Sequence, residues 1–570
     1  MKTKKLFGMA SLAAMMMISN VGCASNQSAS STAASSTATS SAQSETTETA
    51  KNTEAISSVD VKIKPGTLSG WKQGNVYKFL GVPYATAERF KAPQAIESYP
   101  DGHQLALSYG TVSPQTRTFS ATGEVNASEI MTPSNGTADM VGNENCQNLN
   151  VWTNSLEGSK PVIVFFHGGG LSTGASSELS YYTGEHLASE DDVVFVSVNH
   201  RLNDLGFLDL SAYGDEYATS GLNGLEDCKV ALQWVQDNIE SFGGDPKNVT
   251  IVGQSGGGNK VTTLASMDDT KDLFDKVVVM SGMYSTVSEA QAKEQVKKLQ
   301  ESLGLSDEEF VPALEKMSYE ELYAACRNAE VSTAAPYGIG SFKEPFIDEN
   351  GQMNENAKAR TWMIGSTFSE FSDNTNPLLY YGVKENKLDE ITDEQATERL
   401  KETYGDQTDA LIEAFKEMYP EKPLAEALFL NQFPSSLWSV IDMNSEDGLL
   451  DKMSEQGATI YNYVTAYTQP GFGGMTQFHT SDIPFWFDSC EEADYLIAGD
   501  EVNAQKVEET MSQALVSFAK TGNPAVADVD WPAWNAKERP TMIFDVTPTL
   551  TEGGQTKLYD IVAAAQKAGE

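Results

Sequence analysis

The sequence predicts an α/β fold with a mostly parallel, doubly wound central sheet, and two observations support this prediction. Short runs of β-branched and apolar residues recur along the chain, as expected for strands that are buried on both faces. These runs are residues 161–166, 192–198, 248–253, 276–280 and 361–365. Residues 228–242, between the second and third runs, carry apolar side chains at helical spacing. Strand, helix and strand in this order are typical of parallel sheets.

Two longer stretches, from 285 to about 360 and from 373 to about 460, have a helical pattern and many charged residues. No linker rich in Gly, Pro or Ser separates them from the rest of the chain. We therefore expect one domain at 59–570, in which these stretches are helical insertions that cap the edge of the sheet and cover a binding cleft.

The first residues have the pattern of an export signal. Three lysines precede the apolar run 6–18, which is too short to span a bilayer, so residues 1–22 are predicted to be a signal peptide. The residues up to Cys23 resemble a bacterial lipobox, in which the cysteine is lipidated and anchors the protein outside the cytoplasm. Residues 23–58 would then be the anchor and a disordered tether rich in Ser, Thr and Ala. The alternative is an ordinary secretory signal and a secreted protein.

The composition is strongly acidic, with 80 Asp and Glu against 39 Lys and Arg and a formal net charge of -41. Such a surface repels nucleic acid phosphates and anionic lipid headgroups, so binding to either is not expected. The chain has no CxxC and no HExxH motif, and we predict neither a metal nor another cofactor. Besides Cys23, four cysteines remain: Cys146, Cys228, Cys326 and Cys490. They allow three fully paired sets of disulfides, but so few cysteines in so long a chain are more often free and buried.

The segment GQSGGG, residues 253–258, places a serine between glycines directly after a predicted strand. Ser255 also precedes residues 259–265, which can be helical. A strand, a tight turn and a helix form a nucleophile elbow, in which the glycines make room for a strained backbone and leave the hydroxyl accessible. A second GxSxG segment surrounds Ser172, but no strand immediately precedes it, so we interpret that segment as a turn.

HGGG, residues 167–170, comes directly after the predicted strand 161–166. Backbone without side chains lets two amides converge on one oxygen, and the amide of Gly256 can supply a third donor. Acyl transfer requires such donors where negative charge develops in the transition state. The alternative is a plain glycine-rich turn, but its position beside the predicted elbow favours an oxyanion-binding loop.

A serine nucleophile needs a base, usually a histidine, which in this fold follows the serine in the chain. The chain has five histidines: His103, His167, His186, His200 and His479. Only His479 follows Ser255, and it is therefore the predicted base. The third member should be a carboxylate between these two residues, at the end of a strand. Glu370 meets both conditions, and its place after the run 361–365 favours it over Asp348 or Asp373.

Taken together, these segments resemble the type B carboxylesterase and cholinesterase family of α/β hydrolases, from about residue 66 to residue 544. The matching segments occur in family order: KFLGVPYATAERFKAP, ENCQNLNVW, FFHGGG, VNHRLNDLGFL, the segment from NGLEDCKVALQW to VGQSGGG, HTSDIPFWF and FAKTGNP. The resemblance implies an α/β hydrolase fold and a bacterial lipoprotein member of the family. It also implies a serine hydrolase that cleaves small-molecule carboxylic esters through an acyl-enzyme intermediate.

Position by position, the resemblance implies a nucleophile, an acid and a base: Ser255, Glu370 and His479. It assigns the oxyanion hole to the amides of Gly169, Gly170 and Gly256. Three positions depart from the family pattern: Gln254 replaces the usual Glu, Gly256 the usual Ala, and Phe371 the usual Gly after the acid. Since Gln254 removes a negative charge beside the site, a choline-like cationic substrate is not expected.

Two further functions use the same fold. One is a noncatalytic binding or adhesion protein, which is disfavoured because the serine, the acid and the base are all present. The other is an amidase or carbamate hydrolase with the same three residues, since only the leaving group differs. The sequence therefore predicts a hydrolase and leaves the choice of bond open.

Overall fold

The structure is a computed structural model that describes residues 55–116, 140–282, 284–370, 388–430, 448–471, 474–526 and 529–569. The predicted signal peptide, Cys23 and most of the predicted tether lie outside these residues. Ile56–Glu570 forms one compact unit. Its first strand begins at Ser57, so residues 57 and 58, which the sequence assigns to the tether, belong to a strand.

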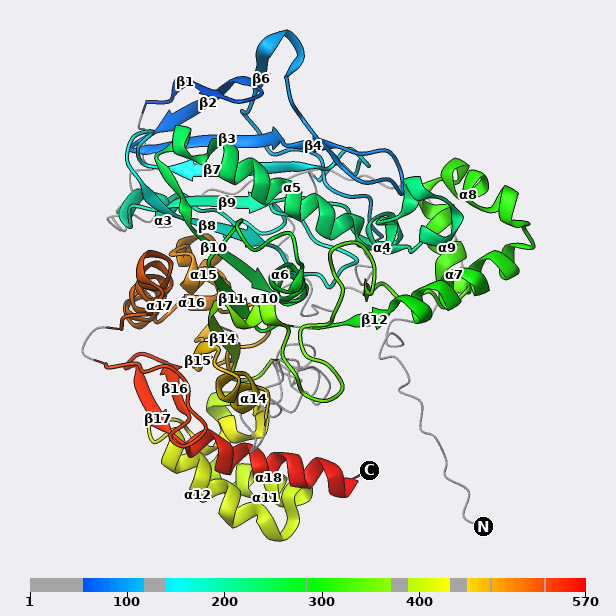
Figure 1. Ribbon diagram of the computed structural model, residues 1–570. Helices are drawn as coiled ribbons and strands as arrows, with labels where there is room; N and C mark the ends of the chain where they lie inside the picture. Colours follow the sequence, from blue (N-terminus) through cyan, green and yellow to red (C-terminus); the bar gives the residue numbers. More distant parts are fainter. Residues whose placement is uncertain are drawn as a thin grey trace, which may run out of the picture. The chain divides into compact units, whose positions relative to one another are not determined.

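A thirteen-stranded sheet runs through this unit (Figure 1). The strands follow one another across the sheet in the order β1 (Ser57–Ile63), β2 (Gly66–Gln73), β3 (Val76–Pro83), β7 (Asn148–Thr153), β9 (Val194–Val198), β8 (Lys160–Phe166), β10 (Gly244–Gln254), β11 (Lys276–Met280), β14 (Thr361–Thr367), β15 (Thr459–Thr465), β16 (Pro540–Phe544) and β17 (Thr549–Glu552). A further strand, β6 (His103–Leu105), pairs with β2.

The centre of the sheet, from β9 to β16, is parallel, and antiparallel strands flank it on both sides. All five predicted strands lie in this parallel centre, which confirms the predicted sheet. Strand β9 begins later than the sequence indicates because Asp192 has a φ of 55°, a turn conformation. The strand order changes direction between β9, β8 and β10, which is the arrangement of a doubly wound sheet.

Helices cover both faces of the sheet, and the side chains of β8 divide between them. Val162 and Val164 belong to the core that contains residues of α5 (Asn223–Asn238) and α6 (Gly256–Ser266). Ile163 and Phe165 belong to the core of α3 (Glu185–Glu190), α15 (Ile483–Trp486) and α17 (Glu501–Thr521). Two apolar layers on one sheet explain why its central strands lack polar alternation.

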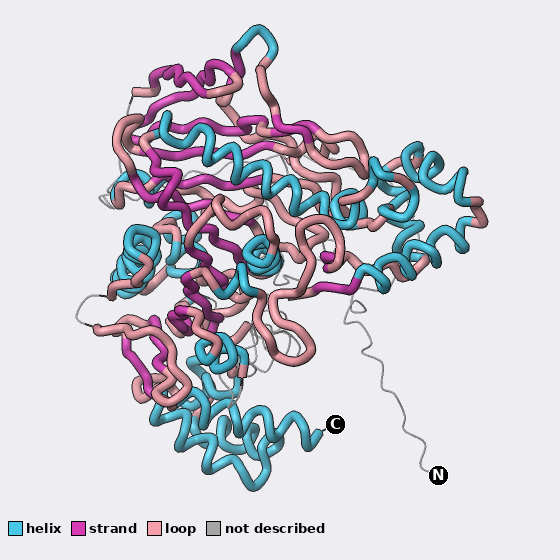
Figure 2. The backbone as a smooth tube through the Cα atoms, viewed as in Figure 1, coloured by secondary structure: helices cyan, strands magenta, loops and turns pink. Residues whose placement is uncertain are grey.

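The two predicted insertions form helical clusters with cores of their own (Figures 1 and 2). The first insertion contains α7 (Glu289–Leu303), α8 (Asp307–Lys316) and α9 (Tyr319–Asn328). The second contains α11 (Asp393–Tyr404) and α12 (Thr408–Met418), and the C-terminal α18 (Gly554–Gly569) packs against them. The predicted helical stretch to residue 360 is too long. After α9 the chain forms the short β13 (Ala335–Tyr337) and loops, because Pro336 and several glycines with positive φ interrupt helical backbone.

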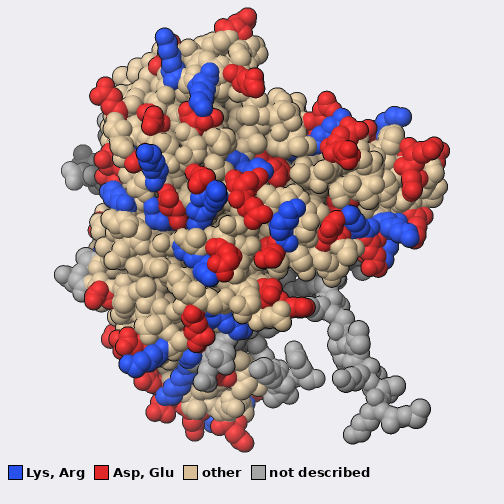
Figure 3. Space-filling view, viewed as in Figure 1, with Lys and Arg blue, Asp and Glu red and all other residues tan. Residues whose placement is uncertain are grey.

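The remaining elements are short: β4 (Ala85–Thr86), β5 (Gln94–Ala95), α4 (Asn203–Phe207), β12 (Thr286–Ser288), α10 (Glu355–Lys358), α14 (Leu449–Glu455) and α16 (Asp494–Ile497). Acidic and basic side chains are interspersed on the face shown in Figure 3. Within the described ranges, no helix combines the length and the apolar composition needed to cross a bilayer.

Candidate active site

Ser255 lies at a sharp turn between β10 and α6, as the sequence predicts. Its φ of 55° and ψ of -120° are strained for a residue with a side chain. The Ser255 amide donates to the Met280 carbonyl at 2.9 Å, which ties the turn to β11. A Cβ added at Gly253 would lie 2.1 Å from the Gly257 carbonyl oxygen, so the turn requires glycine there. Close backbone packing thus stabilises a conformation that presents the serine at the start of a helix.

The glycine-rich loop after β8 packs against the first turn of α6. Gly169 and Gly170 have φ values of 82° and 64°, and within the described ranges their amides donate to no other protein group. A Cβ added at Gly256 would lie 2.0 Å from the Gly170 carbonyl oxygen. The glycine that departs from the family pattern therefore lets this loop lie directly on α6. A Cβ added at Gly168 would lie 3.3 Å from the Ser255 Cβ, so the loop borders the elbow.

Glu370 and His479 are brought together although they lie 109 residues apart in the chain. The Nδ1 atom of His479 lies 2.5 Å from Oε2 of Glu370, and both side chains are buried. Glu370 follows β14 and has a φ of 37°. Its other carboxylate oxygen accepts a hydrogen bond from the Thr367 amide at 2.8 Å. The carboxylate is thus held from both sides and directed at the imidazole.

The surroundings of Glu370 favour its ionised form. Burial opposes ionisation, but the charge of His479 and the hydrogen bonds from His479 and the Thr367 amide outweigh burial and hold the pKa of Glu370 below its usual value. An ionised carboxylate accepts the proton on Nδ1. The lone pair of the imidazole is then on Nε2, the atom that a general base uses.

Gln254 connects this pair to the elbow. Its Nε2 atom lies 3.4 Å from Nε2 of His479, which places the imidazole against the residue that precedes Ser255. In the described part of the chain, no hydrogen bond from the Ser255 hydroxyl is present, and the residue keeps 6% of its surface exposed. Unliganded hydrolases often tighten such contacts only when substrate binds.

Two buried charged residues near the site escaped sequence reasoning. Asp482 is fully buried three residues after His479, where it accepts a hydrogen bond from Trp486 Nε1 at 3.1 Å. Burial and the charge of Glu370 raise the pKa of Asp482 to about 7. Lys260, in α6, is also fully buried. The only signal in the sequence is a charged residue within an otherwise apolar or small-residue segment.

The other candidates from the sequence lie elsewhere or have structural roles. His103 contacts Ser69 and His186 pairs with Glu491. Ser172 belongs to a turn in which its amide donates to the Gly169 carbonyl, which confirms the interpretation of the second GxSxG segment. The four cysteines are free and buried, as expected: Cys146, Cys228, Cys326 and Cys490. No group of His, Cys, Asp and Glu that could hold a metal occurs within the described residues.

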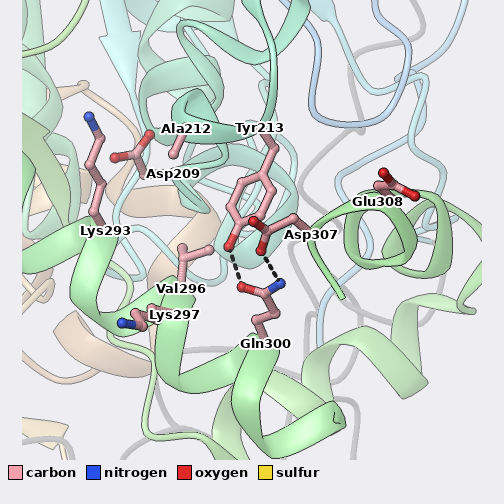
Figure 4. A pocket seen from close by; sticks show the side chains of 9 residues that line it. All are labelled: Asp209, Ala212, Tyr213, Lys293, Val296, Lys297, Gln300, Asp307 and Glu308. Atoms are coloured by element: carbon pink, nitrogen blue, oxygen red, sulfur yellow. Dashed lines mark hydrogen bonds between the residues drawn. The ribbon is translucent and has the colours of Figure 1, made fainter. Parts of the chain in front are cut away.

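A cavity of about 630 Å³ lies between α7, the start of α8 and the segment before residue 213 (Figure 4). Its lining residues are Asp209, Ala212, Tyr213, Lys293, Val296, Lys297, Gln300, Asp307 and Glu308. The Tyr213 hydroxyl donates to Gln300, which in turn donates to Asp307, at 2.8 and 2.7 Å. The lining residues come from the first helical insertion and from residues 209–213, and none of them belongs to the elbow or the glycine-rich loop.

Comparison with known proteins supports the same chemistry. A solved structure of an esterase from the anaerobe Clostridium hathewayi, described as able to hydrolyse aliphatic aromatic polyesters, superimposes with a TM-score of 0.77. It is 31% identical and covers 90% of this chain and 100% of that one. The para-nitrobenzyl esterase of Bacillus subtilis (strain 168) is 28% identical over 502 residues, which are 85% of this chain and 94% of that protein.

A third relative, the phenmedipham hydrolase of Pseudarthrobacter oxydans, is 36% identical over 267 residues, 45% of this chain and 49% of that protein. The Carboxylesterase family matches residues 57–562, nearly the whole compact unit. The solved relatives are carboxylesterases of the α/β hydrolase fold, in agreement with the parallel sheet described above. The chain therefore belongs to the Carboxylesterase family of α/β hydrolases and is a serine hydrolase that cleaves carboxylic esters.

Proposed function

We propose that Ser255 is the nucleophile of this ester hydrolase, with His479 as its base and Glu370 as the carboxylate that orients the base. The contact of 2.5 Å between Glu370 and His479 carries the proposal. It keeps the proton on Nδ1, so that Nε2 is the basic atom. The contact of Nε2 with Gln254 supports the assignment because Gln254 is the neighbour of Ser255.

The proposed reaction begins when His479 Nε2 takes the proton of Ser255 and the serine oxygen attacks the ester carbonyl. The amides of Gly169, Gly170 and Gly256 donate to the oxyanion that forms, and the charge of Glu370 stabilises the imidazolium. His479 then gives its proton to the leaving alkoxide, and an acyl enzyme remains. Water, activated by the same imidazole, releases the acid and restores the serine.

The chain offers a matched pair of variants for this proposal. We expect Ser255→Ala to lower kcat for 4-nitrophenyl acetate by at least about 1,000-fold, because the nucleophile is lost. Ser172→Ala removes the serine of the other GxSxG segment and should leave kcat within about twofold. Substantial turnover by folded Ser255→Ala protein, or equal losses in both variants, would contradict the assignment.

The substrate is a small-molecule ester, and we infer that neutral esters are preferred. Gln254 supports this inference, since it places a neutral amide next to His479 where the family usually has a carboxylate. The value of kcat/KM for phenyl butyrate should exceed that for butyrylcholine. The Clostridium hathewayi esterase makes esters of aromatic acids a reasonable second set of substrates to compare. A preference for the choline ester would overturn the inference.

Carbamate hydrolysis is a second candidate activity. It is favoured by the 36% identity to the phenmedipham hydrolase, which extends over about half of each protein. The same serine would attack the carbamate carbonyl, and the carbamoyl enzyme would be hydrolysed more slowly than an acyl enzyme. Release of the arylamine from phenmedipham, compared with ester turnover at one enzyme concentration, separates the two activities.

We also infer that the enzyme is exported and anchored outside the cytoplasm through a lipid on Cys23. The lysines before the apolar run 6–18 and the lipobox-like residues up to Cys23 support this inference. A tether rich in Ser, Thr and Ala would let the hydrolase reach substrates at a distance from the membrane surface. Secretion without an anchor is the alternative.

A further inference from the structure

Lys260 is an unusual residue for its position. It lies in α6, five residues after Ser255, with no exposed surface. Its Nζ atom donates to the carbonyl oxygen of His167 at 2.8 Å. Among the described residues no carboxylate forms an ion pair with it, and burial lowers its pKa to about 7. A buried amine without a counter-ion costs folding free energy that an apolar side chain of similar length would avoid.

The bond from Lys260 joins the two elements that supply the proposed oxyanion hole. His167 is the first residue of the glycine-rich loop, and α6 carries Gly256 at its first position. The loop contributes the amides of Gly169 and Gly170. One side chain of the helix therefore fixes the loop relative to the helix, and thus two of the donors relative to the third.

The glycine-rich loop needs such support because its backbone is not fixed by its own side chains. Gly169 and Gly170 have positive φ values. In the unfolded chain, glycine adopts such values as one of many accessible conformations, so holding the loop in this one conformation needs support. On the other side, the His167 ring stacks on the His200 ring, with centroids 5.0 Å apart and planes within 10°. His200 donates from Nδ1 to the Arg201 carbonyl.

The charged and titratable groups around Lys260 do not neutralise it. Three groups interact with Lys260 through their charges: the Cys228 thiol of α5, the Glu178 carboxylate in the segment between β8 and β9, and the His200 imidazole. Among the described residues, Glu178 forms no ion pair with Lys260. Burial raises the pKa of Cys228 and lowers that of His200, so both are neutral near pH 7. Either protonation state of Lys260 retains an N–H for the His167 carbonyl, so the bond does not require the charge.

We propose that Lys260 is a positioning residue for the oxyanion hole: through the His167 carbonyl it holds the Gly169 and Gly170 amides in the orientation that the transition state requires. This inference rests on the proposed roles of Ser255 and of the three amides. The proposal assigns the buried amine to catalysis rather than to folding. Buried ionisable groups that cost folding free energy are often found at functional sites.

The test replaces Lys260 with an apolar residue of similar length in the full-length protein. We expect Lys260→Met to lower kcat for 4-nitrophenyl acetate by about 10- to 100-fold with KM within about twofold, because misplaced oxyanion donors act on the transition state alone. The inhibition constant of a trifluoromethyl ketone should rise by the same factor, since Ser255 converts this ketone into a tetrahedral oxyanion. Lys260→Leu serves the same purpose if the methionine variant does not fold.

Lys276→Met is the matched control. Lys276 is a second buried lysine, at the start of β11, and donates to Asn248 Oδ1 at 2.5 Å. The Lys276→Met substitution should change the melting temperature but neither kcat nor the affinity for the ketone. Unchanged kcat in the folded Lys260 variant, or equal losses of kcat in both lysine variants, would falsify the inference. If the wild-type enzyme turns over through Ser255 in the same assays, such a result leaves the proposed function intact and removes only the role of Lys260.

Discussion

At the residue scale, the site depends on positions where a side chain is absent. Gly256 follows the proposed nucleophile, and its missing Cβ leaves room for the Gly170 carbonyl. Ser255 itself keeps a left-handed backbone that the bonds to Met280 and Gly258 stabilise. Glycine at residue 256, where the family usually has alanine, therefore has a structural role in the turn. It permits a closer approach of the oxyanion loop.

This close approach makes Gly256→Ala a sensitive variant. The added methyl would lie 2.0 Å from the Gly170 oxygen, so the loop must move. We expect kcat to fall by about 10- to 100-fold, as for the partial loss of one oxyanion donor, with little change in KM. Gly142→Ala is the control, because its Cβ would meet nothing closer than 3.5 Å. Wild-type kcat for Gly256→Ala would show that the loop tolerates the methyl.

The charge of Glu370 can be removed without changing the shape of its side chain. Glu370→Gln should lower kcat on the order of 10,000-fold, because a neutral amide no longer fixes the imidazole tautomer or stabilises its cation. Glu426→Gln alters another buried glutamate, which pairs with Lys422 at 3.0 Å, and should reduce stability but not kcat. Steady-state kinetics and thermal melts of both proteins test the assignment, which fails if Glu370→Gln retains more than a tenth of the activity.

Sequence order and local motifs were sufficient to nominate Ser255, His479 and Glu370, because each stands next to a predicted strand or in a family segment. Lys260, Asp482 and the side-chain contact of Gln254 were not predicted. Their importance comes from burial, and burial of a charged residue depends on which distant segments pack around it. A single sequence does not contain that information.

At the element scale, the loop after β9 is fixed to α5 by a buried ion pair. Arg201 donates to both carboxylate oxygens of Asp227, at 2.9 and 2.7 Å, and also donates to the Lys91 carbonyl. Both side chains of the pair are nearly inaccessible to solvent. The same loop contains His200, whose ring stacks on that of His167 at the start of the glycine-rich loop. The pair therefore connects a helix, a strand end and the surroundings of the site.

Breaking this pair should be costly. We expect Asp227→Ala to reduce the free energy of unfolding by about 3–5 kcal/mol, because the guanidinium of Arg201 would remain buried without its partner. Asp237→Ala removes the partner of the exposed Lys64 and should cost at most about 1 kcal/mol. Urea denaturation of both variants measures the difference. Similar losses of unfolding free energy in the two proteins would mean that the Arg201 guanidinium becomes hydrated or donates to another acceptor.

At the scale of the whole molecule, the sequence predicted the parallel centre of the sheet but not its full width. The central strands are apolar on both faces and are therefore recognisable, whereas β1 to β3 and β17 have mixed burial patterns that a periodicity test does not separate from loops. The insertions were recognised as helical, but the position of their ends depends on prolines and glycines within them. Residues 371–387 and 431–447 of the second insertion lie outside the described residues.

The proposed anchor is a property of the whole chain and can be tested in cells. Cys23→Ser should prevent lipidation, so that the protein is released from the membrane fraction into the medium or remains as an unprocessed precursor. Labelling with an alkyne-tagged palmitate, followed by fractionation, checks both outcomes. Substitution of Cys146, which is buried in the folded unit, is the control and should leave labelling unchanged. Equal labelling of the Cys23→Ser protein would contradict the anchor.

The central claim is that the oxygen of Ser255 becomes covalently bonded to the substrate. The most direct measurement is treatment of the purified protein with a fluorophosphonate, followed by peptide mass spectrometry. The account predicts one stoichiometric adduct, on the peptide that contains Ser255, with loss of esterase activity in proportion to labelling. An adduct on another residue, or full labelling of the Ser255→Ala protein, would contradict it.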